Sequence, residues 1–417
     1  MQTSDRTPWA WVPSLYFAEG LPYFIVNTIS VVMFKDMGMD NGILALVTSL
    51  IGLPWVLKPL WSPFVDILKS KRWWIVATQA AIGIALALIA LQAGAFAFAL
   101  TMFAVAALSS ATHDISADGY YMLALSKSNQ SAFVGIRNTF YRVAMVFGQG
   151  VLIVFAGLIQ KRSGSVNTAW SVTMLLAAAI MSVLALYHYR ILPQPSEDSN
   201  RSAGSASAVL KEFAGVFKSF FTKKGVWLAV AFMLLYRLPE ALSVKMLYPF
   251  FSDVAESGGL GLDKEAYGLV YGTFGVIALL AGGILGGLHI ARKGLRHCML
   301  PMALALALPC SVYLLLSIFR PSMLWLVGLC VVFDQFGYGY GFTAYTVYMM
   351  RFSDGPLKTS HYALCTGFMA LSMLLPGLFA GYLQQWLGYR MFFIFVMICC
   401  LATIFVTLSA RRRLPSA

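Results

Sequence analysis

Residues 193–208 read PQPSEDSNRSAGSASA, a run of small and polar residues that predicts a flexible linker. The rest of the chain is unusually apolar: 59% of its 417 residues are hydrophobic, 11% are charged, and the mean hydropathy is +0.75. A soluble globular protein carries about 25% charged residues. A chain this apolar cannot cover a surface that faces water, so the linker must join two halves of a membrane protein.

Six apolar runs precede the linker and six follow it, each about 20 residues long or longer, which suffices to cross a bilayer. Their approximate bounds are 10–33, 43–66, 73–92, 96–125, 135–160, 169–190, 225–250, 265–290, 298–318, 322–350, 359–386 and 389–410. Because only helices or closed barrels satisfy the backbone in lipid, we predict an all-α membrane protein with twelve transmembrane helices. We expect an N-terminal six-helix bundle over 1–190, a cytoplasmic linker with an amphipathic helix over 191–224, and a C-terminal six-helix bundle over 225–417.

The basic residues gather in alternate loops, which predicts the orientation of the chain. Placing both termini in the cytoplasm puts the dense clusters inside, and these are Lys69/Lys71/Arg72, Arg292/Lys293/Arg296 and Arg411/Arg412/Arg413. The net charge of +13 therefore indicates orientation in a membrane and not a nucleic-acid partner.

The two halves resemble each other in sequence. Span 1 contains YFAEGLP at residues 16–22 and span 7 contains YRLPEAL at residues 236–242. Spans 4 and 10 each hold an aspartate, Asp114 and Asp334, ahead of a tyrosine-rich stretch. Two parallel six-helix halves with a site between them are what an alternating-access transporter needs.

Ionisable residues inside a span cost at least a few kcal/mol each, so each one needs an explanation. They are Glu19, Lys58, Asp114, Asp118, Arg137, Arg142, Arg237, Glu240, Lys245 and Asp334. One interpretation is that they form neutralised pairs that hold helix to helix. The other is that carboxylates face a cavity and accept protons. For that role Asp114 is the first candidate and Glu19 the second, followed by Asp118, Glu240 and Asp334.

Depth in the membrane predicts which charges can meet. Asp118 and Arg142 both come out roughly 10 Å from the inner interface at 1.5 Å per residue. Asp114 lies one turn deeper on the same helix face as Asp118. We therefore expect Arg142 to pair with Asp114 or Asp118, with Lys58 and Arg237 as the other charge partners.

Span 10 is rich in tyrosine and glycine between residues 333 and 348. Alternating glycines permit close helix packing or a local break, and tyrosines offer flat faces with a hydroxyl at the tip, which suit sugar rings. The alternative is ordinary packing or contact with lipid. The candidate substrate contacts are Gln149, Gln335, Tyr338 and Tyr345.

Several motifs of the first half resemble those of a known family. They are FAEGLP at 17–22, LP at 53–54, KPLWSPFVD at 58–66, SSATHDISAD at 109–118 and YRVAM at 141–145. Together they resemble the AmpG-type muropeptide permeases, which are major facilitator proteins related to acetyl-CoA transporters. The resemblance is strongest over residues 15–150.

The resemblance implies a major facilitator fold of two pseudo-symmetric six-helix bundles. It also implies proton-driven import of cell-wall saccharide–peptide fragments across the bacterial inner membrane. The loop between spans 2 and 3 resembles a conformational latch, with Asp66, Lys69, Lys71 and Arg72 as gating residues and Arg137 beside them. His113 stands where the family has glutamine and Glu19 where it has a small residue. Another disaccharide or small glycan is therefore an alternative substrate.

An alternative hypothesis from a different class of protein is a membrane-embedded acyltransferase, because His113 and Asp118 match a His-x4-Asp pair. No glycine-rich acyl-acceptor motif follows this pair, and no Walker or nucleophile-elbow sequence is present. A receptor or scaffold that does not transport is a further alternative. The six cysteines lack metal-ligand spacing and are interpreted as small core residues. We expect a monomer without enzymatic activity, cofactor or metal, whose partners are the bilayer, protons and a small saccharide or muropeptide.

Overall fold

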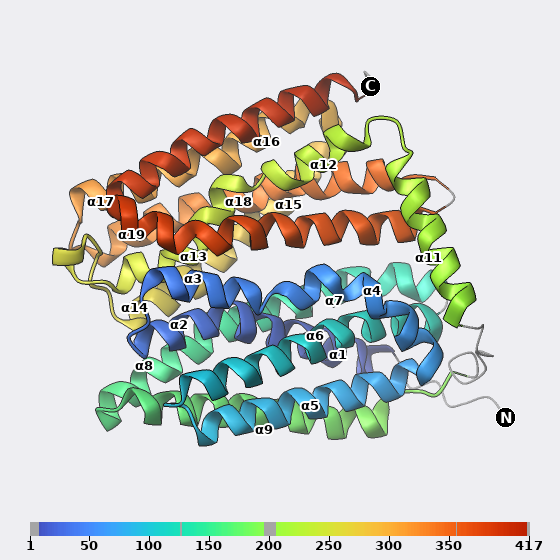
Figure 1. Cartoon of the computed structure of the whole chain (residues 1–417), viewed down its shortest axis with the longest axis horizontal. Helices are drawn as coiled ribbons and strands as arrows, with labels where there is room; N and C mark the ends of the chain where they lie inside the picture. Colours follow the sequence, from blue (N-terminus) through green and yellow to red (C-terminus); the bar gives the residue numbers. More distant parts are fainter. Residues whose placement is uncertain (1–7, 126, 196–205, 356, 415–417) are drawn as a thin grey trace. The chain divides into compact units, whose positions relative to one another are not determined.

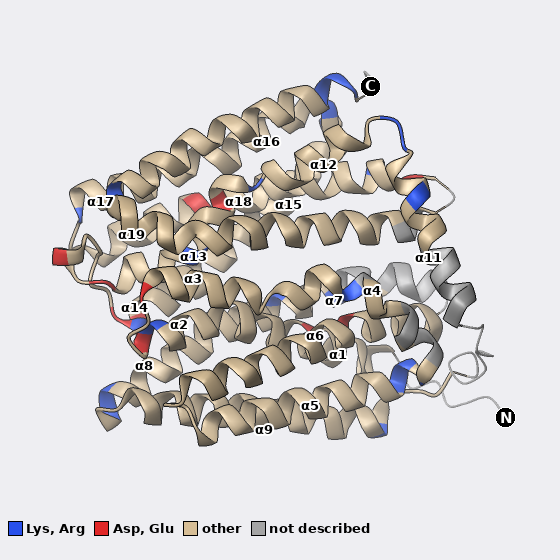
Figure 2. Cartoon of the chain, viewed as in Figure 1, with Lys and Arg blue, Asp and Glu red and all other residues tan. Residues whose placement is uncertain are grey.

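The computed structural model describes residues 8–125, 127–195, 206–355 and 357–414, and every regular element in these ranges is helical. Ten of the described segments are long and apolar enough to cross a membrane. Long stretches of these helices carry no charged residue, and the charged positions gather mainly at helix ends and in loops (Figure 2). The chain is therefore a multi-pass integral membrane protein.

Three of the predicted spans, which correspond to α18 and α19, need separate comment. Helix α19 (Lys358–Arg412) merges two helices across Gly388, whose φ of 71° breaks the helical backbone. Helix α18 (Leu324–Ser353) has 30 residues, but its polar and glycine-rich middle lowers its mean hydropathy. Dividing α19 at Gly388 and including α18 gives the twelve transmembrane helices that the sequence predicts, so the fold class is confirmed.

Contacts divide the chain into two compact units, the first up to Met37 and from Ile51 to Ala214, the second over Gly38–Leu50 and from Gly215 onward. The helices of the first unit are α1 (Val12–Phe24), α2 (Ser30–Asp36), α4 (Leu53–Leu68), α5 (Lys71–Leu91), α6 (Phe96–Ala124), α7 (Lys127–Val146), α8 (Leu152–Ser163) and α9 (Val166–Ile191). Those of the second are α3 (Asn41–Leu50), α12 (Val226–Leu235), α13 (Leu238–Ser252), α14 (Lys264–Tyr267), α15 (Val276–Lys293), α16 (Leu295–Ala307), α17 (Ser311–Phe319), α18 and α19. Helix α11 (Ala206–Phe221) crosses the boundary between the units.

In the first unit α5 packs against α6 and α9, and α1 packs against α7 (Figure 1). Small residues allow these approaches. A Cβ at Gly20 would lie 2.9 Å from the carbonyl oxygen of Tyr141, and one at Gly83 would lie 3.0 Å from the hydroxyl of Ser182. Small residues at helix contacts are the usual packing device in membranes, where no hydrophobic force drives helices together.

In the second unit the glycines of span 10 clamp α18 between two neighbours. A Cβ at Gly337 would lie 2.1 Å from the carbonyl oxygen of Ala305 in α16, and one at Gly339 would lie 2.0 Å from that of Leu279 in α15. Positions two apart on a helix face opposite sides, at 100° per residue. The alternation of glycines therefore serves close packing on two faces.

The second predicted span is broken, which the sequence analysis did not foresee. Its first part is α3, in the second unit, and its second part is α4, in the first. A turn at Ile51–Gly52 separates them, and Pro54 lies in the first turn of α4, where its missing N–H leaves no hydrogen bond unmade.

Helix α3 is held in the second unit by side-chain hydrogen bonds and close packing. The amide of Asn41 donates to Oε1 of Gln384 over 2.7 Å and to the hydroxyl of Tyr389 over 3.0 Å. At the start of the helix, partial burial raises the pKa of Asp40, but hydrogen bonds from the backbone of Ile43 and from the Gln385 amide outweigh it and lower the pKa. The charged form of Asp40 thus stabilises this end of α3.

Candidate functional site

Asp114 of α6 is the centre of a polar site in the first unit. Lys58 of α4 places its ammonium 3.6 Å from Oδ2 of Asp114, and the indole N–H of Trp55, one turn earlier, donates to the same oxygen over 3.1 Å. The other oxygen, Oδ1, is buried and has no hydrogen-bond partner in the described part of the chain. One carboxylate oxygen is therefore held by α4, while the other is available to bind a proton.

Asp118 lies one turn along the same helix and has different partners. The guanidinium of Arg137 in α7 lies 2.7 Å from Oδ1 of Asp118, and the hydroxyl of Tyr16 in α1 donates to that oxygen over 3.2 Å. The Arg137 guanidinium also lies over the rings of Tyr16 and Tyr121, 4.4 and 5.4 Å from their centroids. The ion pair with Asp118 and the two cation–π contacts together hold the Arg137 side chain in place.

Glu19 completes this site from α1. The residue is 7% exposed, and its Oε2 atom is buried without a hydrogen-bond partner among the described residues. The charges that act on it are those of Asp118, Asp114, Arg137 and Lys58. The structure thus brings together three of the carboxylates singled out in the sequence, and Glu19 has the weakest local compensation.

Asp118 has a cationic partner that the sequence analysis did not predict. Arg137 was expected beside Asp66 at the interface, but the structure pairs it with Asp118. A pairing of Arg142 with either aspartate stays a prediction, and the side chain of Asp66 lies outside the described residues.

The other predicted gating residues follow α4. The guanidinium of Arg72 donates to the backbone carbonyls of Leu192, over 3.1 Å, and Tyr189, which ties the start of α5 to the end of α9. Lys71 is buried along α6, whereas Lys69 is exposed. Their gating role stays a prediction.

A second charged site lies in the second unit, where α12 and α13 meet. Arg237 stands at the break between these helices, just before Pro239, and donates to Glu240 over 3.1 and 3.3 Å. It also donates to the hydroxyl of Tyr338 over 2.7 Å, and its guanidinium lies 4.8 Å from the ring centroid of Phe342. A broken helix with a charge pair at the break is a feature of transporter binding sites.

Asp334 is held by neutral donors. The hydroxyl of Tyr313 in α17 donates to Oδ2 over 2.6 Å, and the amide of the adjacent Gln335 donates to the same oxygen over 3.0 Å. The residue is 6% exposed. A buried carboxyl group between neutral partners can gain or lose a proton without breaking an ion pair.

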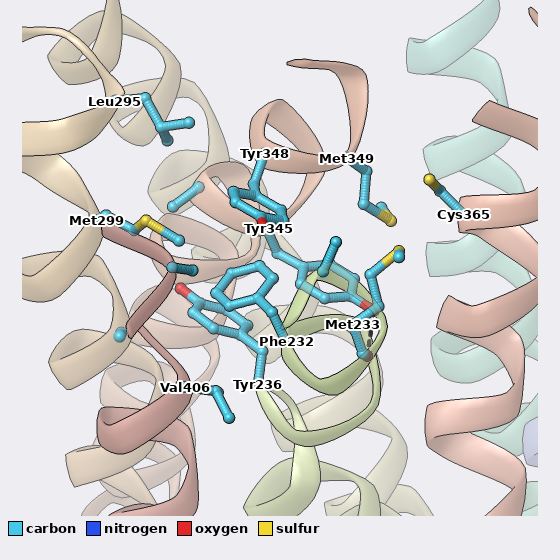
Figure 3. Close-up of a cluster of buried hydrophobic side chains, with 14 of the residues drawn as sticks. Phe232, Met233, Tyr236, Leu295, Met299, Tyr345, Tyr348, Met349, Cys365 and Val406 are labelled. Carbon is cyan, nitrogen blue, oxygen red and sulfur yellow. Dashed lines mark hydrogen bonds between the residues drawn. The ribbon is translucent and has the colours of Figure 1, made fainter. Parts of the chain in front are cut away.

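In this structure the side chains predicted to contact the substrate make hydrogen bonds to other groups of the protein. Gln149 donates to the hydroxyl of Thr28 over 3.0 Å. Tyr345 lies in a cluster of aromatic and methionine side chains (Figure 3), where its hydroxyl donates to the carbonyl of Met233 over 2.7 Å and its ring stacks on Tyr236. A substrate contact at Tyr345 would require this cluster to open. The assignment of these residues to substrate stays a prediction.

His113 and Asp118, the pair that suggested an acyltransferase, face different partners. The imidazole of His113 lies 2.9 Å from the amide nitrogen of Gln79, and the Gln79 oxygen lies 2.9 Å from Nδ1 of His188, whose Nε2 lies 2.9 Å from the hydroxyl of Ser14. This buried chain joins α1, α5, α6 and α9. Residues five apart on a helix diverge by about 140°, so His113 and Asp118 form no catalytic pair here.

Sequence reasoning missed Trp55, Tyr16 and Tyr313, which donate to Asp114, Asp118 and Asp334 respectively. All three are aromatic residues with a polar tip inside a span, and such tips usually find a partner when buried. No group of three or more His, Cys, Asp or Glu side chains among the described residues could hold a metal ion.

The Arg237–Glu240 pair gives a testable stability effect. The two side chains are 7% and 16% exposed, so Arg237→Met leaves the Glu240 carboxylate buried without its cation. We expect a loss of roughly 3 kcal/mol in the free energy of unfolding, because breaking a buried pair costs more than replacing it. Thermal unfolding in detergent measures the loss, and Arg237→Met combined with Glu240→Leu should restore most of it. A single variant as stable as the wild type would contradict the buried pair.

Comparison with known sequences identifies a family and individual relatives. The sequence profile described as the Major Facilitator Superfamily matches residues 14–356. The anhydromuropeptide permease of Escherichia coli K12 is 25% identical over 414 residues, which cover 96% of this chain and 79% of the permease.

Solved structures resemble this one throughout its length. A bacterial homologue of the human lysosomal transporter Spinster, inward-facing and occupied, has a TM-score of 0.74 at 13% identity and covers 99% of this chain and 98% of its own. A D-xylose–proton symporter has a TM-score of 0.71 at 12% identity, with coverages of 97% and 96%. At such identities the likeness establishes the fold.

Proposed function

Because this chain belongs to the major facilitator superfamily, we propose that it is a proton-coupled symporter that imports a cell-wall-derived muropeptide of the anhydro type. The observation that carries the proposal is the site around Asp114, where Oδ1 of Asp114 and Oε2 of Glu19 are buried without hydrogen-bond partners in the described chain. A charge in this position is costly and a neutral carboxyl group is not.

Protonation at this site determines whether the transporter can change between its inward-facing and outward-facing conformations. With a proton on Asp114 or Glu19, the excess negative charge beside Lys58 and Arg137 is removed, and the loaded carrier can change conformation. When the proton leaves, Lys58 holds the Asp114 carboxylate at 3.6 Å until the empty carrier returns. The proton thus shifts the population of states through its differential affinity for them.

The substrate assignment rests on the E. coli relative, which is named for anhydromuropeptides and aligns with nearly the whole chain. The motifs of the first half support it, since they include Lys58, Asp114 and Arg142. Another disaccharide or small glycan is the alternative substrate.

The remaining assignments belong to the same proposal. The chain acts as a monomer in the bacterial inner membrane, with both termini in the cytoplasm, as the distribution of Lys and Arg indicates. It has no enzymatic activity and needs no cofactor or nucleic acid. Lys69, Lys71, Arg72, Arg137 and Asp66 gate the cytoplasmic side.

Uptake into proteoliposomes tests the function. We expect labelled anhydromuropeptide to accumulate against its gradient, up to about ten-fold per unit of pH difference for one proton per substrate. A protonophore should abolish the accumulation, and an unrelated disaccharide serves as the control. Equal uptake with and without the proton gradient would refute coupling, and uptake of the disaccharide alone would refute the substrate.

A further inference from the structure

Lys245 of α13 is a buried cation that the proton site does not use. The residue is 9% exposed, and its ammonium donates over 3.2 Å to the backbone carbonyl of Thr48. No carboxylate of the described residues lies within ion-pair distance of it. An ammonium has three N–H donors, and an ionisable residue in a span marks a functional site unless a partner neutralises it.

The carbonyl that accepts from Lys245 belongs to the last turn of α3. That helix ends at Leu50, so the Thr48 carbonyl is one of the final four that have no partner within the helix. The C-terminal end of a helix also carries partial negative charge. The end of α3 therefore gives the Lys245 ammonium one neutral carbonyl as its acceptor, and no full negative charge.

A second group without a partner lies at the same junction. The hydroxyl of Ser49 is buried and has no hydrogen-bond partner among the described residues. A Cβ at Gly377 of α19 would lie 2.3 Å from this hydroxyl and 3.5 Å from Cγ of Lys245. Gly377 thus lies against the unpartnered Ser49 hydroxyl and the aliphatic stem of Lys245, whose ammonium bonds to the carbonyl of the adjacent Thr48.

We propose that Lys245 binds a carboxylate of the transported molecule and that the Ser49 hydroxyl donates a second hydrogen bond to it. The Thr48 carbonyl occupies the ammonium until the carboxylate replaces it. A carboxylate matches the single positive charge and accepts from both donors. This inference rests on the proposed function and deepens it, because the peptide of a muropeptide carries carboxylates and a plain disaccharide does not.

The position of α3 explains how a ligand would reach this lysine. The turn at Ile51–Gly52 connects α3 to α4, which belongs to the other unit. A movement of α4 therefore acts on the end of α3 that covers Lys245. Withdrawal of that end would remove the acceptor of the ammonium, and an anion is the partner that best stabilises a buried cation.

The test compares two forms of one ligand on the purified full-length protein. The probes are an anhydromuropeptide with free carboxylates and the same molecule with its carboxylates methylated, and calorimetry gives both affinities. We expect the wild type to prefer the free acid by about 10- to 100-fold, the range for a hydrogen bond to a charged group. Lys245→Met should bind both forms alike, while Lys245→Arg and the exposed control Lys293→Met keep the preference.

Each outcome decides the matter. A wild type that binds both forms equally, or a Lys245→Met variant that still prefers the acid, would overturn the inference alone. If Lys245→Met loses affinity for both forms equally, the lysine only stabilises the end of α3 and does not bind the carboxylate. If the wild type binds neither form, the proposed function fails and this inference with it. Should Lys245→Met not fold, Ser49→Ala must reduce the preference several-fold for the inference to stand.

Discussion

Asp114→Asn abolishes concentrative uptake, so that the inside-to-outside ratio falls from about ten at one unit of pH difference to about one. Asparagine has the shape of aspartate and still accepts from Trp55, whose indole lies 3.1 Å from Oδ2. It cannot change its charge, so it cannot couple a proton to the ion pair with Lys58. Binding and exchange of substrate between two loaded sides should continue. Proteoliposome uptake with a proton gradient, beside counterflow without one, measures both.

The matched comparison is Glu19→Gln, which removes the second candidate from the same site. Arg137→Lys, which keeps the charge beside Asp118, is the control for a change of packing. If the variants at Asp114 and Glu19 both still concentrate substrate, the proton site lies elsewhere. Asp334 and Glu240 of the second unit are then next in line.

Gly381→Val should lower the free energy of unfolding by about 3 kcal/mol or more, at the upper end of the cost of overpacking. Gly381 lies in α19, where a Cβ would stand 1.8 Å from the backbone oxygen of Asn41. That oxygen belongs to a helix backbone and cannot move aside alone, so α3 must leave α19. The hydrogen bonds from the Asn41 amide to Gln384 and Tyr389 would then be lost as well.

Thermal unfolding in detergent measures this effect, and transport should fall in parallel because α3 covers Lys245. Gly287→Val is the control, since a Cβ at Gly287 would meet nothing within 4 Å. Its free energy of unfolding should stay within about 1 kcal/mol of the wild type and should not fall, because valine has a higher helix propensity than glycine. Equal stability of the Gly381 and Gly287 variants would show that α3 does not depend on this contact.

Hydropathy predicts the helices well because the bilayer imposes length and apolarity on each span. It does not predict breaks. Pro54 and Pro239 each lie in the first turn of a new helix. Pro54 belongs to the LP motif at 53–54, and that motif alone does not indicate the start of a second helix. A proline in an apolar run can kink, end or begin a helix, and the neighbours decide which.

Ion pairs are harder to predict than depth in the membrane, because two side chains must match both in depth and in their direction around the helix axes. The structure brings the guanidinium of Arg137 to 2.7 Å from Oδ1 of Asp118, so height and direction both match for Arg137. Arg142 lies more than a turn beyond it and faces about 140° away from Arg137.

The glycines of α18 have a consequence for how the second unit can move. Gly337 and Gly339 bring its backbone against α16 and α15 on opposite faces, without side chains between them. Helices that interlock in this way cannot slide past one another or change their crossing angle, because there are no rotamers to rearrange. We therefore expect the three helices to move together, while the backbone breaks at Arg237 and Gly388 and the separate helix α3 allow other parts of this unit to move.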